Sequence, residues 1–79
     1  TVYTVNKEAT KEIAKQLRLR DIGGIVVIDY IDMKLSENRK KIEELLEAEL
    51  KNDRSKTQVI GFTKLNLLEM TRKHIGINE

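Results

Sequence analysis

The feature that most constrains this chain is an unbroken run of four β-branched residues at positions 25–28, with the sequence Ile-Val-Val-Ile. The run is entered through Gly23 and Gly24 and is followed directly by Asp29. A continuous apolar run of this length, bounded by glycine, is typical of a strand buried on both faces of an α/β sheet. The two glycines offer a turn in which positive φ or close backbone approach costs little. We therefore predict a central or near-central strand, buried at residues 25–28 and flanked by helices.

The segment before this strand has the pattern of an amphipathic helix over residues 7–18, with Asn6 as its N-cap. Glu8 lies in the first turn of this helix, where a negative charge complements the helix dipole. Apolar residues spaced four apart form one stripe that we expect to pack on the sheet, namely Ala9, Ile13 and Leu17. The alternation within residues 1–5 fits either a strand or the end of a loop.

Two or three further elements follow the apolar strand. A second helix is predicted from Ser36, as its cap, to about Asn52, because apolar residues recur along one face. A short strand is expected at residues 56–61, and the order strand, helix, strand implies a right-handed parallel crossover. Residues 67–73 fit a third strand or a short helix, and their alternation favours the strand. The predicted class is α/β, with the order helix, strand, helix, strand and a possible last strand.

Composition narrows the class of protein. Seventy-nine residues without proline or an internal linker allow one small domain, over residues 1–79. The chain has no cysteine, which excludes disulfides and thiolate metal sites within it. It shows neither a signal peptide nor a transmembrane run, so a cytoplasmic location is expected. The net charge of +2 does not by itself indicate a partner.

Asp29 is the first candidate functional residue, because it stands where the apolar strand leaves the core. A carboxylate at the end of a buried strand has a rigid backbone and access to solvent, which suits an oxygen-ligated cation such as Mg²⁺. The alternative is structural, since many strands end on an aspartate that caps a helix or begins a turn. Asp32 follows three residues later, and for it the capping role before the second helix is favoured. His74 is interpreted as an exposed or packing histidine.

Longer stretches of the sequence resemble one family. Residues 16–33 have the sequence QLRLRDIGGIVVIDYIDM, residues 68–73 have LEMTRK, and Asp53-Arg54 and the GFT of residues 61–63 lie between them. Together these stretches resemble the ribonuclease E/G family over essentially the whole chain. The resemblance is closer to the shorter, ribonuclease G-like members.

This resemblance implies a Mg²⁺-dependent, single-strand-specific endoribonuclease of bacterial RNA processing and decay. Asp29 matches one of the family's two metal-binding aspartates, and the other belongs to an upstream Asp-Ile-Asn strand motif that the chain lacks before Asn6. The chain therefore resembles the C-terminal part of the DNase I-like catalytic subdomain, and as an isolated fragment it is expected to be inactive. Family members also share a zinc ion between protomers through a later CPxCxG segment, which is absent here and implies a homo-oligomeric parent protein.

Single-stranded RNA is the partner that this resemblance implies. Phosphate contacts need positive charge, and the candidates for them are Arg18, Arg20, Arg54, Lys56, Arg72 and Lys73. For any one of these residues the alternative is ordinary solvated surface charge. For the whole chain the alternative is a non-catalytic α/β module that binds RNA or a protein partner, with a structural Asp29. Because upstream strands are missing, we also expect an unpaired sheet edge or an uncovered apolar face, and hence self-association of the fragment.

Overall fold

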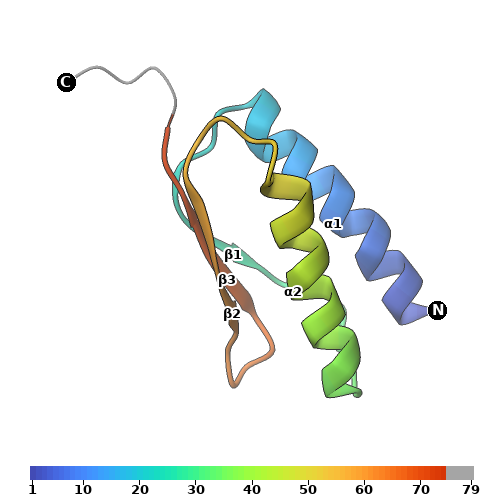
Figure 1. Ribbon diagram of the computed structural model, residues 1–79. Helices are drawn as coiled ribbons and strands as arrows, with labels where there is room; N and C mark the ends of the chain where they lie inside the picture. Colours follow the sequence, from blue (N-terminus) through green and yellow to red (C-terminus); the bar gives the residue numbers. More distant parts are fainter. Residues whose placement is uncertain (75–79) are drawn as a thin grey trace.

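Two helices lie on one side of a three-stranded sheet in the computed structural model, which describes residues 1–74 (Figure 1). In chain order the elements are α1 (Val2–Leu19), β1 (Gly24–Ile28), α2 (Ser36–Leu50), β2 (Thr57–Phe62) and β3 (Leu68–Arg72). The predicted α/β class is confirmed, as is the strand that alternation favoured for residues 67–73. Neither helix is long and apolar enough to cross a membrane.

Strand β3, the last strand within residues 1–74, occupies the centre of the sheet. The strand order is β1-β3-β2, and β3 pairs antiparallel with both neighbours. Because β1 and β2 are each antiparallel to β3, they run in the same direction, as the predicted crossover through α2 requires. They do not pair with each other, since β3 separates them. On β3 the side chains of Leu68, Met70 and Arg72 are all buried.

The predicted central position of residues 25–28 is wrong, because β1 is an edge strand of the described sheet. Ile25 is 78% exposed and Val27 is 52% exposed, whereas Ile28 is buried and Val26 is partly buried. The helices cover only one side of the sheet, and successive strand residues point to opposite sides. Half of the apolar run therefore lies on the side that no described element covers. The expected unpaired edge and uncovered apolar face are both present in residues 1–74.

Both helices begin differently from the prediction. Residues 2–5 belong to α1, whose N-cap is Thr1, and the Thr1 side chain accepts a hydrogen bond from the Thr4 amide at 3.1 Å. The predicted strand or loop at residues 1–5 and the predicted cap at Asn6 are therefore wrong. In α2 the residue Ser36 is helical, and Leu35 takes the cap position without a side-chain hydrogen bond.

The core lies between the helices and the side of the sheet that faces them. Buried residues of α2 recur four apart, at Ile42, Leu46 and Leu50, which directs one apolar face inward. This face packs on α1 and on β2. The buried stripe of α1 is displaced from the predicted one and packs mainly on α2; it consists of Asn6, Thr10, Ala14 and Leu17. Ala9 and Ile13 are only partly buried beside it.

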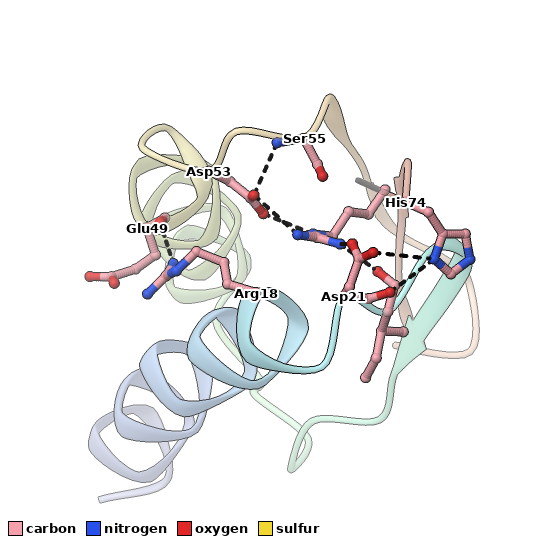
Figure 2. Close-up of polar contacts among 8 residues, drawn as sticks. Arg18, Asp21, Glu49, Asp53, Ser55 and His74 are labelled. Carbon is pink, nitrogen blue, oxygen red and sulfur yellow. Dashed lines mark hydrogen bonds and ion pairs between the residues drawn. The ribbon is translucent and has the colours of Figure 1, made fainter. Parts of the chain in front are cut away.

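A buried arginine, Arg72, joins the connections at one end of the fold. Its partners Asp21 and Asp53 are labelled in Figure 2. The Arg72 side chain is fully buried, and its Nε and Nη2 donate to the two carboxylate oxygens of Asp53 at 2.8 and 3.1 Å. Its Nη1 donates to the Asp21 carboxylate at 2.9 Å and to the Ile22 carbonyl at 3.0 Å. We call Arg72, Asp53 and Asp21 the arginine cluster. It ties the turn after α1 and the turn after α2 to the central strand.

Asp21 reaches Arg72 from a left-handed backbone conformation, with φ of 48°. The amides of Asp21 and Ile22 donate to the carbonyls of Arg18 and Leu17, at 3.3 and 3.1 Å. This pair of bonds is the Schellman arrangement that closes many helices, usually with glycine at the left-handed position. Aspartate tolerates this conformation better than most residues. The ion pair with Arg72 gives a physical reason for an aspartate here.

The two glycines at the start of β1, Gly23 just before it and Gly24 as its first residue, have the two roles that the sequence offered. Gly24 has a positive φ of 94°. Gly23 lies against the His74 ring, and a Cβ added there would be 2.7 Å from a ring carbon. The His74 Nδ1 also lies 2.9 Å from the Asp21 carbonyl oxygen. His74 is thus an exposed, packing histidine, as predicted.

The arginine cluster predicts how stability depends on pH. The hydrogen bonds from Arg72 hold the pKa of Asp53 below its usual value, so folding favours the ionised carboxylate. This contribution is complete above the unfolded-state pKa, at about pH 4, and is lost as the pH falls through the lower folded-state pKa. We expect the free energy of unfolding to fall more steeply below about pH 4 in the wild type than in Asp53→Asn.

Urea unfolding at a series of pH values between neutral and acidic would measure this difference. Asp32→Asn is the matched control, because it removes an exposed carboxylate whose partner is an uncharged amide. Parallel stability curves for the wild type and Asp53→Asn in acid would contradict the prediction.

Candidate functional site

Asp29 lies immediately after β1, and its side chain is exposed. The alternation of exposed and buried residues continues past the strand, with Ile28 and Tyr30 buried and Asp29 and Ile31 exposed. Asp29 therefore follows Ile25 and Val27 on the side away from the helices. Within residues 1–74 its carboxylate has no hydrogen bond or ion pair, so both oxygens are open to a ligand. This exposed position at a strand end agrees with the sequence prediction.

Asp32 does not cap α2, contrary to the favoured interpretation of the sequence. Its Oδ1 accepts a hydrogen bond from the Asn66 side-chain amide at 2.8 Å, while Leu35 holds the cap position of α2. Asn66 lies in the connection between β2 and β3 and has a left-handed backbone, with φ of 63°. Asp32 therefore links its own segment to that connection.

The segment that carries both aspartates, residues 29–32, is held by polar side chains of α1. Asn6 is 2% exposed; its Nδ2 donates to the Ile31 carbonyl at 2.8 Å, and its Oδ1 accepts from the Ile31 amide at 3.3 Å. One turn later, the Thr10 hydroxyl lies 2.6 Å from the Tyr30 hydroxyl. Burial raises the pKa of Tyr30, so the phenol keeps its proton. We call residues 29–32 the aspartate segment.

Asn6, Thr10 and Asn66 were not identified as site residues from the sequence. One signal was available, because Asn6 and Thr10 are spaced four apart and fall in line with Ala14 and Leu17 on the buried face of α1. Polar residues within a buried stripe need hydrogen-bond partners. The local pattern does not say which distant backbone groups provide them.

The six predicted phosphate-binding residues do not form one group. Arg18 lies near the end of α1 and donates to the Glu49 carbonyl at 3.2 Å (Figure 2). Arg20 is the C-cap of α1 and donates to the Gln16 side chain at 3.0 Å. Arg54 is exposed in the turn after α2. Arg72 is buried and bound to two carboxylates, so it cannot contact an RNA phosphate in this conformation. The prediction for Arg72 is corrected to a structural role.

Lys56 and Lys73 are brought together by the structure. The Lys73 amide donates to the Lys56 carbonyl at 3.0 Å, which extends the pairing of β2 and β3 by one step. Both side chains are exposed and line a hollow of about 590 Å³ at the end of the sheet where β1 begins. Its other lining residues are Gly24, Ile25, Thr57, Gln58, Thr71 and Arg72. We call this the basic hollow.

Among the residues predicted from the sequence to form the site, Asp29 is the one whose side chain could bind a metal ion. Among residues 1–74, no three side chains of the histidine, cysteine or acidic type gather closely enough to hold an ion. Mg²⁺ is often bound through one or two carboxylates, with water and substrate phosphate as its remaining ligands. An exposed carboxylate without a competing cation fits one such position. Asp29 can therefore contribute one ligand to a hydrated cation.

Known proteins resemble this chain closely. A sequence profile of the ribonuclease E/G family matches residues 1–75. Ribonuclease G of Escherichia coli (strain K12) is 52% identical over 73 residues, which cover 92% of this chain and 15% of that protein. Ribonuclease G of Haemophilus influenzae is 52% identical over the same shares of the two chains. Ribonuclease E of Buchnera aphidicola subsp. Schizaphis graminum is 44% identical over 76 residues, or 96% of this chain and 8% of that protein.

The sequence match covers every element of the fold, from the buried face of α1 to the central strand β3. The chain spans about 15% of the length of the ribonuclease G relatives. It is a member of the ribonuclease E/G family.

Proposed function

We propose that this chain forms part of the DNase I-like catalytic subdomain of a Mg²⁺-dependent endoribonuclease that cleaves single-stranded RNA in the bacterial cytoplasm. Asp29 is one of two metal-binding aspartates in this proposal, and the second comes from an upstream strand outside the chain. The observation that carries the proposal is the exposed, unpaired Asp29 carboxylate at the end of β1 in a ribonuclease family member. The unpaired edge of β1 offers a place for that upstream strand.

A divalent cation supplies two things to phosphodiester hydrolysis, which are a more acidic bound water and positive charge beside the non-bridging oxygens. The part of this chain is to hold the ion through Asp29, a hard anionic oxygen donor. The carboxylate is positioned by a backbone fixed on one side by β1 and on the other by the contacts of the aspartate segment. Zinc binding, and the assembly of protomers around the zinc ion, would be functions of other segments of the parent protein.

The basic hollow provides positive charge for the substrate. Lys56 and Lys73 lie at the opposite end of β1 from Asp29, on a surface that RNA can reach. Ammonium groups bind phosphate without reading sequence, which suits an enzyme that acts on many RNAs. Arg54 extends this positive charge toward the turn after α2.

The non-catalytic module remains the second candidate, and one observation favours it. Among the described residues, no three histidine, cysteine or acidic side chains gather closely enough to hold an ion by themselves. A module of this kind would bind RNA through the basic hollow, and its Asp29 would be dispensable. Substitution of Asp29 separates the two candidates.

In the complete parent protein, Asp29→Asn should lower Mg²⁺-dependent RNA cleavage by orders of magnitude, because the amide lacks the anionic charge that holds the ion. RNA binding and the fold should be preserved, since the Asp29 side chain makes no hydrogen bond or ion pair in the described structure. Asp32→Asn should cost less, because its amide can still accept from Asn66. The 79-residue chain alone should cleave no faster than buffer with Mg²⁺. Near-normal rates for Asp29→Asn at limiting Mg²⁺ would rule out the metal role.

Replacing Lys56 or Lys73 by alanine should weaken RNA binding and flatten its salt dependence. Each lost phosphate contact should reduce the slope of log K against log salt by about 0.7 for a single strand. Lys40→Ala is the matched control, because Lys40 is exposed on α2 and away from the basic hollow. Fluorescence anisotropy with a labelled single-stranded RNA over a range of salt would measure the slopes. If all three variants kept the wild-type slope of log K against log salt, the basic hollow would not be a site of RNA phosphate contacts.

We also expect the isolated chain to self-associate through β1. The β2 edge is blunted, because the register shifts between Val59 and Gly61 and the Phe62 amide donates to the Glu43 side chain at 3.0 Å. In the described structure the β1 edge is apolar and uncharged, and it has neither a register shift nor a side-chain hydrogen bond to its backbone. It can therefore pair with a strand of another chain.

Sedimentation at several concentrations would test this association. Ile25→Lys should shift the chain toward monomer, because a charge on an edge strand opposes pairing. Leu65→Lys, at an exposed loop residue, should leave the association unchanged. A wild-type chain that stays monomeric across the micromolar range would contradict the prediction.

A further inference from the structure

We propose that Asn6 and Thr10 of α1 are positioning residues, which fix the aspartate segment so that Asp29 presents its carboxylate to a divalent cation. This inference rests on the proposed function, and it adds a role for a helix face that neither the sequence motifs nor the family resemblance identify.

The first support is the way Asn6 binds Ile31. One side-chain amide satisfies both backbone polar groups of that residue, donating to its carbonyl and accepting from its amide. This is the pair of bonds that a neighbouring strand would supply. The Ile31 side chain is 52% exposed, so the segment is held here by its backbone rather than by burial of its side chain. Asn6 thus substitutes for a strand partner beyond the end of the sheet.

The second support is the chain of hydroxyl groups behind Tyr30. The Thr10 hydroxyl donates to the Asn6 carbonyl at 2.7 Å, which uses its only proton. The 2.6 Å contact between Thr10 and Tyr30 must therefore be donated by the Tyr30 phenol. The Tyr30 ring also packs on Phe62, with ring centroids 5.9 Å apart. Tyr30 is held from α1 and from β2 at once.

The third support is where the sheet stops. Pairing of β1 with β3 ends at Ile28 and Leu68, so Asp29 is the first residue past the ladder. Its direction depends on the residues that follow it, and the next two are the ones that Thr10 and Asn6 bind. A displacement of about 1 Å at a reacting centre can cost about 100-fold in rate. A clamp on residues 30 and 31 is therefore placed to set the geometry of Asp29.

Amide hydrogen exchange on the 79-residue chain can test whether Asn6 holds the backbone of Ile31. Asn6→Ala should speed exchange at the Ile31 amide by about tenfold or more, because the amide of an exposed residue loses its acceptor. The Met70 amide in β3 should keep its protection. Asn6→Asp is the second variant, since it retains an acceptor for the Ile31 amide and should preserve more of the protection. An unchanged exchange rate at the Ile31 amide in Asn6→Ala would show that Asn6 does not hold the aspartate segment in place.

The functional half needs the complete parent enzyme. Asn6→Ala and Thr10→Val should raise the Mg²⁺ concentration for half-maximal cleavage by about 10- to 100-fold, the usual effect of losing a group that orients a metal ligand. Their RNA affinity without Mg²⁺ should stay at the wild-type value. Ile42→Val is the matched control, because it loosens the core at α2 and removes no hydrogen bond of the aspartate segment, and it should leave the Mg²⁺ requirement unchanged.

The outcomes separate the two proposals. A wild-type Mg²⁺ requirement in Asn6→Ala, together with loss of cleavage in Asp29→Asn, would overturn the positioning role and keep the proposed function. Equal rises in the Mg²⁺ requirement for Asn6→Ala and Ile42→Val would reduce Asn6 to a stabilising residue, which also overturns the positioning role. Wild-type cleavage by Asp29→Asn would overturn the proposed function and with it the link to the cation, whatever the exchange rates at Ile31.

Discussion

The buried guanidinium of Arg72 is the interaction on which the arrangement of this fold depends. A cation with a fully buried side chain is costly unless its N–H groups are bonded to anions, and four of its hydrogen bonds are provided by Asp53, Asp21 and Ile22. These partners come from the two connections that lead into β1 and β2. The central strand can therefore take its place only when both connections have closed around Arg72, which couples the last strand of the chain to the ends of both helices.

The sequence predicted the elements better than it predicted their places in the sheet. Period-two alternation identified β3, and the four-residue spacing of apolar residues identified α2. The apolar run of β1 suggested a central strand, but such a run records only that both faces of a strand meet apolar groups somewhere in the whole protein. Within the described residues 1–74 one face of β1 is bare, and the chain spans a small part of its relatives. None of the elements described in residues 1–74 covers that face.

Local sequence patterns were enough to predict where Asp29 lies. They did not reveal side chains whose partners are distant in the sequence. Asp29 follows from its place at a strand end, whereas the role of Asn6 depends on a backbone residue 25 positions away. Arg72 was misinterpreted although a local pattern was available. As a basic residue near the end of the chain it suggested a phosphate contact, but the alternation that placed Leu68 and Met70 inward also places Arg72 inward. Its strand register was the better guide to its role than its charge.

Strand geometry adds a constraint on how the two ends of β1 can share one RNA strand. Asp29 lies five positions along the chain from Gly24, which lines the basic hollow, and this corresponds to about 17 Å along an extended chain. A lysine side chain at the hollow does not reach across that distance to the phosphate held at Asp29. In the proposed function the lysines therefore hold the RNA at a different nucleotide from the one that is cleaved. Under this proposal the lysines contribute to binding, and Asp29 with the helix face behind it contributes to the chemical step.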